Sequence, residues 1–122
     1  MNIDRVEFKE CGNGVVKATI NDCTYDALEK LNRKFIAPST SDVEIDNRWS
    51  AKDNEYLMRN SYSAIARCSA DDEYDFEVGK RIAAKRLAEK YNKAVDRRLA
   101  KFLVHMNKAL KSMDKYFDGR TF

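Results

Sequence analysis

The sequence predicts an α+β fold, in which an N-terminal antiparallel β-sheet with a short helix precedes a long C-terminal α-helix or helix pair. The apolar residues of the first part alternate with polar ones, a Gly-Asn-Gly turn follows the first apolar run, and a proline-free amphipathic stretch ends the chain. A chain of 122 residues buries one moderate core. We therefore expect a single domain over residues 1–122, with residues 1–70 mainly strands plus one short helix and residues 75–117 helical.

A β-hairpin is predicted at the start of the chain. Its strands are marked by alternate apolar residues, namely Val6 and Phe8 in the first and Val16, Ala18 and Ile20 in the second. Gly12-Asn13-Gly14 stands between them, and these residue types tolerate the positive φ of a tight turn.

A short amphipathic helix is predicted over residues 24–35, behind Thr24, which is a suitable N-cap. Its apolar residues recur three and four positions apart: Tyr25, Leu28, Leu31 and Phe35. The helix must end before Pro38. The polar stretch that follows, residues 38–53, is expected to be a loop in which Val43, Ile45 and Trp49 would mark a short edge strand.

A half-buried strand is predicted over residues 55–68, where the side chains alternate between two faces. The apolar face holds Tyr56, Met58, Tyr62, Ala64, Ala66 and Cys68, and the polar face holds Arg59, Ser61, Ser63 and Arg67. A sheet of three or more strands needs an apolar cover on its buried face. The C-terminal helix is the expected cover.

The long helix is predicted to begin after Asp75 as its N-cap and to run from Phe76 to Phe117, which contains no proline. One stripe of its helical wheel holds Tyr91, Val95, Leu99, Phe102, Leu103, Met106, Leu110, Met113 and Phe117, and the opposite side holds Lys93, Arg97, Lys101, Lys108, Lys111 and Lys115. The earlier apolar residues, Phe76, Ala83, Leu87 and Ala94, peak at another angle. We therefore expect a break, a kink or a change of partner near Tyr91-Asn92.

The apolar stripe is longer than a small sheet can cover, which predicts self-association as a homodimer or a higher homo-oligomer. In the alternative, the helix folds back near Tyr91-Asn92 and buries the stripe within one chain.

Charge is unevenly distributed along the chain, although the net charge is only +3. Residues 1–79 hold ten Lys/Arg against sixteen Asp/Glu, a net −6, and residues 80–122 hold thirteen against four, a net +9. The basic part is expected to face a phosphate-bearing partner. In the alternative, the acidic part docks on the basic part of a neighbouring subunit, or the lysines are simply a solvated helix face.

Location and catalysis are constrained by what the sequence lacks. It shows no apolar leader and no membrane-length apolar run, and its three cysteines are widely spaced, so we expect a cytoplasmic protein without a membrane segment. We expect no enzyme and no cofactor, because no nucleotide-loop, hydrolase or paired metal-ligand motif is present. The acids at Asp71, Asp72, Glu73 and Asp75 suit helix capping better than a metal site, and none is predicted. His105, the single histidine, is expected to be structural before it is catalytic.

The candidate ligand-binding residues lie along the long helix. Polar side chains flank the apolar stripe at Asn92, Arg98 and His105, where a ligand between helices would be touched. Tyr91 and Phe102 lie on the same side and could stack on a base. The candidate phosphate ligands are Arg81, Arg86, Arg97 and Arg98, since guanidinium groups grip diphosphates well.

The stretch from Ala66 to Arg86 resembles a pattern found in small phage proteins of Gram-positive hosts. A strand ends in Cys68, an Asp-Glu-Tyr-Asp segment leads into Phe76, and Gly79 and Ile82-Ala83 open the helix. With the order of strands and then a long helix, the chain resembles the first type of Thoeris anti-defence protein. The resemblance covers about half of the chain.

The resemblance implies a function. Members of this family sequester cyclic ADP-ribose isomers made by bacterial TIR immune enzymes without cleaving them, and some also take cyclic oligonucleotides. It implies a homo-oligomer with a pocket formed partly by the helices, in the cytoplasm of the infected bacterial host, and Asn92 is the first candidate contact. Two alternatives remain: an inhibitor that acts through protein contact, as anti-CRISPR proteins do, and a basic nucleic-acid-binding phage protein, against which the acidic front part argues.

Overall fold

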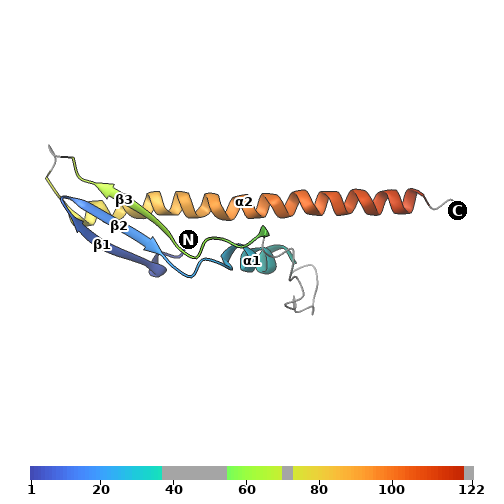
Figure 1. Cartoon of the computed structure of the whole chain (residues 1–122), viewed down its shortest axis with the longest axis horizontal. Helices are drawn as coiled ribbons and strands as arrows, with labels where there is room; N and C mark the ends of the chain where they lie inside the picture. Colours follow the sequence, from blue (N-terminus) through green and yellow to red (C-terminus); the bar gives the residue numbers. More distant parts are fainter. Residues whose placement is uncertain (37–54, 70–72, 120–122) are drawn as a thin grey trace.

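The computed structural model describes residues 1–36, 55–69 and 73–119. In chain order they form the 3-10 turn η1 (Ile3–Arg5), β1 (Val6–Gly12), β2 (Val15–Ile20), α1 (Asp26–Leu31), the π-helical turn η2 (Asn32–Ile36), β3 (Tyr62–Arg67) and α2 (Phe76–Asp118). Figure 1 shows the sheet and α1 along the first part of α2, with the rest of α2 projecting beyond them. The α+β prediction is confirmed. The predicted loop of residues 38–53, with its edge strand at Val43, Ile45 and Trp49, lies outside the described residues.

Within the described residues, the sheet has three antiparallel strands in the order β1-β2-β3. The predicted hairpin is confirmed, and Gly12, Asn13 and Gly14 all have positive φ in its turn. A bulge between Glu10 and Gly12 shifts the register there. The side chains of the central strand that were expected inside are completely buried, namely Val16, Ala18 and Ile20.

The third strand is shorter than predicted, since β3 covers only Tyr62–Arg67 instead of residues 55–68. The inward face is nevertheless correct, because Tyr56, Met58, Tyr62 and Ala66 are buried. The segment before β3 leaves the sheet and follows the chain at Cys23 and Thr24 through backbone hydrogen bonds of 2.8 and 2.9 Å. The apolar period of two therefore marks burial here without marking a continuous strand.

The first helix differs from the prediction in its cap and its face. α1 begins at Asp26 rather than after Thr24, and the Thr24 hydroxyl bonds the side chain of Asn60 at 3.1 Å instead of capping. Tyr25 is 67% exposed, while Ala27 and Leu31 are buried. Tyr25 precedes the helix, so the buried face of α1 is formed by Ala27 and by Leu31, of which only Leu31 was expected there.

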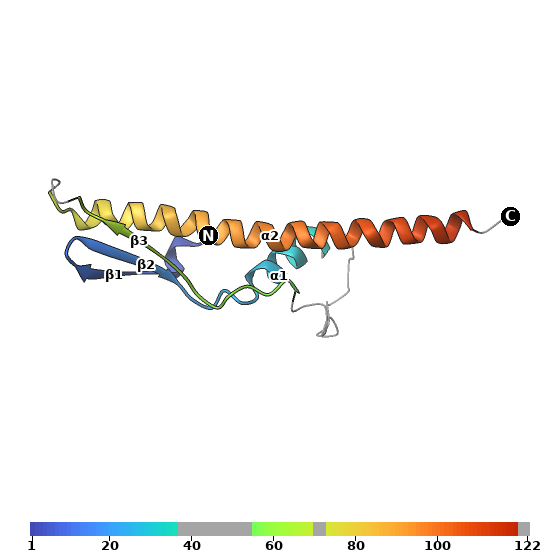
Figure 2. The same cartoon turned by 45° about the horizontal axis from the view of Figure 1, so that its top comes forward.

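The long helix α2 runs for 43 residues without interruption. Of the outcomes expected near Tyr91-Asn92, a break and the alternative fold-back are therefore wrong, and a change of partner is found. Its length is roughly 65 Å at 1.5 Å per residue, and Figure 2 shows it extending from the sheet far past α1. The predicted N-cap is confirmed, because the Asp75 carboxylate accepts from the amides of Glu77 and Val78 at 2.9 and 3.4 Å.

The buried row of α2 explains the apparent change of phase. Its members are Ala83, Leu87, Tyr91, Ala94 and Val95. Steps of four residues advance the wheel angle by about 40°, so the row turns slowly around the helix as it crosses a twisted sheet. What changes near Tyr91 is the partner: α2 packs first on β2 and β3 and then on α1.

Candidate functional site

A depression of about 480 Å³ lies where α1 meets α2, beside the N-terminal residues. Its volume is in the range of ligand pockets, roughly 300–1,000 Å³. The residues that line it are Met1, Asn2, Arg5, Asp26, Glu29, Lys30, Arg33, Lys34, Tyr91, Asn92 and Val95. We call it the junction pocket. It contains two of the predicted site residues, Tyr91 and Asn92.

An ion pair forms the floor of the junction pocket. Arg5 donates to the Asp26 carboxylate at 2.9 Å and to the backbone carbonyls of Asn21 and Asp22 at 2.8 and 3.0 Å. Tyr91 donates to the same carboxylate at 2.7 Å. Partial burial lowers the pKa of Arg5, but the hydrogen bond to Asp26 and the nearby negative charge together outweigh this effect, and the net shift of the pKa is upward. Burial and the bond to Asp26 raise the pKa of Tyr91 well above its usual value, so both groups keep their protons.

Positive charge is in excess around the junction pocket. Its four cations, Arg5, Lys30, Arg33 and Lys34, face two carboxylates, so two positive charges are left over. Arg5 pairs with Asp26, and Arg33 pairs with Glu29. Lys30 and Lys34 have no ion pair with another residue in the part of the chain that the structure describes. This pair of lysines is therefore available to an anion.

Asn92 stands exposed at the rim of the junction pocket, and its amide can both donate and accept. Its neighbour Tyr91 is 9% exposed, and its ring packs edge-on against Tyr62. Tyr91 therefore contributes the pocket wall, and its hydroxyl is already engaged.

Arg97 and Arg98 lie in a second depression of about 610 Å³, along the next turns of α2. Arg98 is held there by bonds to the carbonyls of Leu57 and Ala94 at 3.2 and 3.1 Å. Arg97 is exposed and shares this surface with Lys101 and Glu55.

Phe102 and His105 lie in a third depression, of about 490 Å³, which also has Glu55 on its wall. The rings of both residues pack edge-on against Tyr56. A short hydrogen bond joins the Tyr56 hydroxyl to Nδ1 of His105, and Glu55 lies 3.4 Å from the same nitrogen. This cluster ties the segment before β3 to α2.

Arg81 and Arg86 lie nearer the start of α2, away from these three depressions. Arg86 donates to the backbone carbonyl of Ile65 in β3 at 3.0 Å, and Arg81 is exposed. In the single chain the eight predicted residues are thus spread along α2 and do not surround one cavity.

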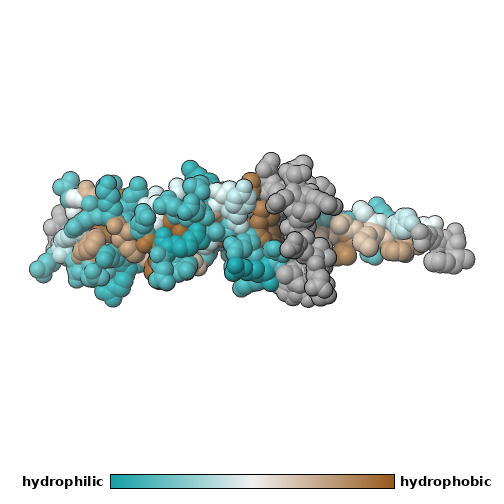
Figure 3. All heavy atoms as spheres, turned by 90° about the horizontal axis from the view of Figure 1, so that it is seen from below, coloured by the Kyte–Doolittle hydropathy of each residue, from teal (hydrophilic) through white to brown (hydrophobic). Residues whose placement is uncertain are grey.

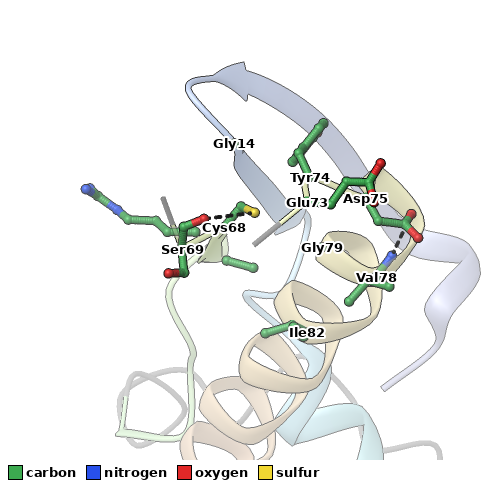
Figure 4. A pocket seen from close by; sticks show the side chains of 11 residues that line it. Gly14, Cys68, Ser69, Glu73, Tyr74, Asp75, Val78, Gly79 and Ile82 are labelled. Atoms are coloured by element: carbon green, nitrogen blue, oxygen red, sulfur yellow. Dashed lines mark hydrogen bonds between the residues drawn. The ribbon is translucent and has the colours of Figure 1, made fainter. Parts of the chain in front are cut away.

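A fourth depression, of about 350 Å³, lies at the N-terminal end of α2 (Figure 4). Glu73, Tyr74 and Asp75 stand on one side of it and Cys68 and Ser69 on the other. Burial and a hydrogen bond to Glu10 raise the pKa of Tyr74 to about 12. The Asp75 carboxylate already occupies the first helical amides and adds negative charge, so this end of α2 does not suit a phosphate.

The four cations of the junction pocket were missed by reasoning from the sequence. The helical wheel of residues 75–117 cannot show them, because Arg5 and the cations of α1 and η2 come from the front of the chain. A local signal was present, since Lys30, Arg33 and Lys34 are three and four positions apart and share a helix face.

No protein-family model, curated protein or solved structure matches this chain. No group of three or more potential metal ligands occurs within residues 1–36, 55–69 and 73–119. Among the helices of those residues, none is long and apolar enough to cross a membrane.

Proposed function

We propose that this protein binds a cyclic ADP-ribose isomer in the junction pocket and sequesters it without cleavage, as a phage counter-defence protein in the cytoplasm of the infected bacterial host. The observation that carries the proposal is the surplus of two positive charges beside the exposed amide of Asn92. A diphosphate-bridged cyclic nucleotide carries two negative charges and has ribose and base edges that an amide can recognise.

The pocket offers separate groups for the two parts of such a ligand. Lys30 and Lys34 lie on one wall and would receive the diphosphate, with the unpaired donors of Arg33 beside them. Asn92 lies on the wall formed by α2 and would bond a ribose hydroxyl or a base edge. The carboxylates of Asp26 and Glu29 are already paired with arginines, which lowers their repulsion of the phosphates.

Self-association is part of the proposal, because the projecting end of α2 carries a seam of exposed apolar residues. Its members are Leu103, Met106, Leu110, Met113 and Phe117, and they are 43% to 60% exposed. Figure 3 shows apolar residues gathered on one side of this projecting end. Their spacing alternates between three and four, which is the heptad pattern of a coiled-coil interface.

The residues that flank this C-terminal seam suit a second copy of the chain. One flank holds Phe102, Ala109 and Tyr116, and the other holds Asn107 and Asp114. The lysines of this segment that are spaced seven apart, Lys101, Lys108 and Lys115, lie on the side away from the seam. Two copies can therefore bring their seams together without apposing like charges.

A retention experiment tests the proposal. The purified protein is mixed with a panel of cyclic ADP-ribose isomers, freed of unbound nucleotide by filtration, and heated, and the released nucleotide is identified by mass spectrometry. We expect one intact isomer, retained at a dissociation constant in the nanomolar range, which corresponds to about 10–12 kcal/mol. Hydrolysed product would indicate an enzyme, and no retention of any isomer would overturn the proposal.

Matched variants locate the site. Replacing both Lys30 and Lys34 by Ala should weaken retention about tenfold or more, since each charge-assisted contact contributes about 1.5 kcal/mol or more. Asn92→Leu should weaken it through loss of the amide. Replacing Lys111 and Lys115 by Ala removes the same charge far from the pocket and should leave retention unchanged. Equal loss of nucleotide retention in the two double variants would indicate a general effect of net charge and not binding in this pocket.

A second candidate function, inhibition through protein contact, is favoured by the same exposed seam. It predicts that the chain binds a partner protein and retains no small nucleotide. The nucleic-acid alternative predicts binding to oligonucleotides that weakens steeply as salt rises, because phosphate contacts release counterions. Both alternatives fail if the retained fraction contains an intact cyclic isomer.

A further inference from the structure

The two edges of the sheet are covered very differently. At the β3 edge, Lys90 of α2 donates to the carbonyl of Ser63 at 2.8 Å, and Arg86 donates to the carbonyl of Ile65 at 3.0 Å. Both donors stand outside the sheet, so these two carbonyls point away from β2. Covering an edge in this way prevents another strand from pairing there.

The positions of these carbonyls determine which groups of β1 point outward. In an antiparallel sheet, alternate residues of a strand bond to one neighbour and the residues between them bond to the other. Ser63 and Ile65 stand opposite Thr19 and Lys17 of β2, so those β2 residues bond to β1 instead.

The partners of Thr19 and Lys17 in β1 are Glu7 and Lys9, whose backbone groups are therefore directed into the sheet. The backbone groups of Val6, Phe8 and Glu10 are left to point outward. The turn η1 uses one of them, since the Val6 amide bonds the Ile3 carbonyl. Within the described residues, no side chain donates to the carbonyls of Val6, Phe8 or Glu10.

Among the residues that the structure describes, none covers the β1 edge from the side of α2. α2 packs mainly on β2 and β3 and only touches β1, and Figure 2 shows β1 on the side of the sheet away from α2. Glu7 and Lys9 are exposed, whereas Phe8 is half-buried against the core. A bare edge of this kind either pairs with another strand or is blocked.

Charge decides which strand fits. A second copy of β1 can pair with the first about a two-fold axis centred on Glu7, Phe8 or Lys9, since each of these registers joins outward-pointing groups. Centring on Glu7 opposes two glutamates, and centring on Lys9 opposes two lysines. Centring on Phe8 places Glu7 of each copy opposite Lys9 of the other, which is favourable on both sides of the axis.

We propose that β1 pairs antiparallel with β1 of a second copy in the register centred on Phe8, so that two sheets join into one. Each Phe8 exchanges backbone hydrogen bonds with its counterpart, and each Glu10 amide bonds the Val6 carbonyl of the other copy. The axis is perpendicular to the sheet, so both α2 helices lie on the same face of the joined sheet. The C-terminal seam lies far along α2, and the two contacts do not compete.

Exchanging the charges at positions 7 and 9 tests the pairing of β1 with β1. The molar mass of the full-length chain is followed by sedimentation across a wide concentration range for the wild type, Glu7→Lys, Lys9→Glu and the double variant Glu7→Lys/Lys9→Glu. Each single change opposes like charges twice and should weaken this association about tenfold or more. The double variant restores opposite charges in the same register and should restore the wild-type mass.

Several results would overturn the pairing: an unchanged mass in both single variants, a double variant that remains dissociated, or a wild type that sediments as a monomer. Because both side chains are exposed, circular dichroism should be the same in all four proteins, and so should the urea midpoint at a concentration low enough for every protein to be monomeric, which excludes misfolding. Nucleotide retention is measured on the same samples. It reports on the junction pocket, so the failure of either proposal is distinguishable from failure of the other.

Discussion

The hydroxyl of Tyr91 in α2 and the guanidinium of Arg5 donate to the same carboxylate oxygen of Asp26 in α1, at 2.7 and 2.9 Å. One partly buried oxygen thus joins the N-terminus, the short helix and the long helix. All three residues line the junction pocket. The shape of the pocket therefore depends on the hydrogen bonds to Asp26 as well as on the side chains at its surface.

Tyr91→Phe should lower the free energy of unfolding by about 1.5–3 kcal/mol, the usual range for a hydrogen bond to a charged group. Urea denaturation measures the change. Tyr25→Phe is the matched control, since Tyr25 is largely exposed, and it should stay within about 0.5 kcal/mol of the wild type. Equal effects of the two variants would show that the bond to Asp26 is not stabilising.

Stability should also fall at alkaline pH because of Tyr91. The folded state raises the pKa of this phenol, so above about pH 10 the unfolded chain releases a proton that the folded chain keeps. The contribution is fully present below about pH 10 and is lost as pH rises toward the folded pKa. Urea midpoints measured on both sides of that pH should fall more steeply for the wild type than for Tyr91→Phe. Parallel curves would contradict the assignment.

Gly79→Ala should destabilise the protein although it replaces a glycine within a helix. An added Cβ would lie 2.6 Å from a methyl group of the fully buried Val16. The gain in helix propensity is at most about 1 kcal/mol, and overpacking a core costs about 1–3 kcal/mol. In a Val16→Ala background the methyl contact is gone and only the contact of 3.3 Å with the Cβ of residue 16 remains, so the same change should destabilise much less. A double-mutant cycle by urea denaturation measures this difference, and additive effects would contradict it.

Local signals in the sequence predict the parts of this fold that depend on neighbouring residues. The turn at Gly12-Asn13-Gly14 and the Asp75 cap follow from backbone sterics and from unpaired helix amides, and both are present. Thr24 failed as a cap because its hydroxyl has a competing partner in Asn60, 36 positions along the chain. A residue's preference for capping a helix is overridden where a distant side chain takes the hydrogen bond that the cap would use.

The junction pocket depends on distant contacts almost entirely. Arg5 reaches α1 only because η1 brings it to Asp26, and α1 reaches Asn92 only because α2 continues straight past Tyr91. The predicted break at Tyr91-Asn92 came from averaging wheel angles over a straight helix, whereas a buried row that follows a twisted sheet changes angle gradually. Asn92 was therefore recognised as a candidate without the cations that surround it.

The cysteines should differ sharply in reactivity. Burial raises the pKa of the Cys23 thiol, and the side chain is inaccessible, whereas Cys11 is exposed on β1. Because the thiolate is the reactive form, a thiol reagent at neutral pH should label Cys11 quickly and Cys23 only after denaturation. Mass spectrometry of digested, labelled protein distinguishes the sites. Rapid labelling of Cys23 in the folded protein would contradict its place in the core.

The same substitution should have opposite consequences at two places on α2. Leu87 is completely buried against the sheet, so Leu87→Ala should cost about 2–5 kcal/mol in urea denaturation, through lost burial and the cavity left behind. Leu110 is 53% exposed on the projecting end, so Leu110→Ala should change the stability of an isolated chain by less than about 0.5 kcal/mol.

Leu110→Ala should instead change the concentration dependence of unfolding. If the C-terminal seam joins two copies, the wild-type urea midpoint rises with protein concentration, and the variant shows a weaker rise because part of the stability of an oligomer comes from mass action. Lys111→Ala, next to Leu110 but off the seam, should behave as the wild type. A wild-type midpoint that does not depend on concentration would exclude the seam as an interface between copies in solution.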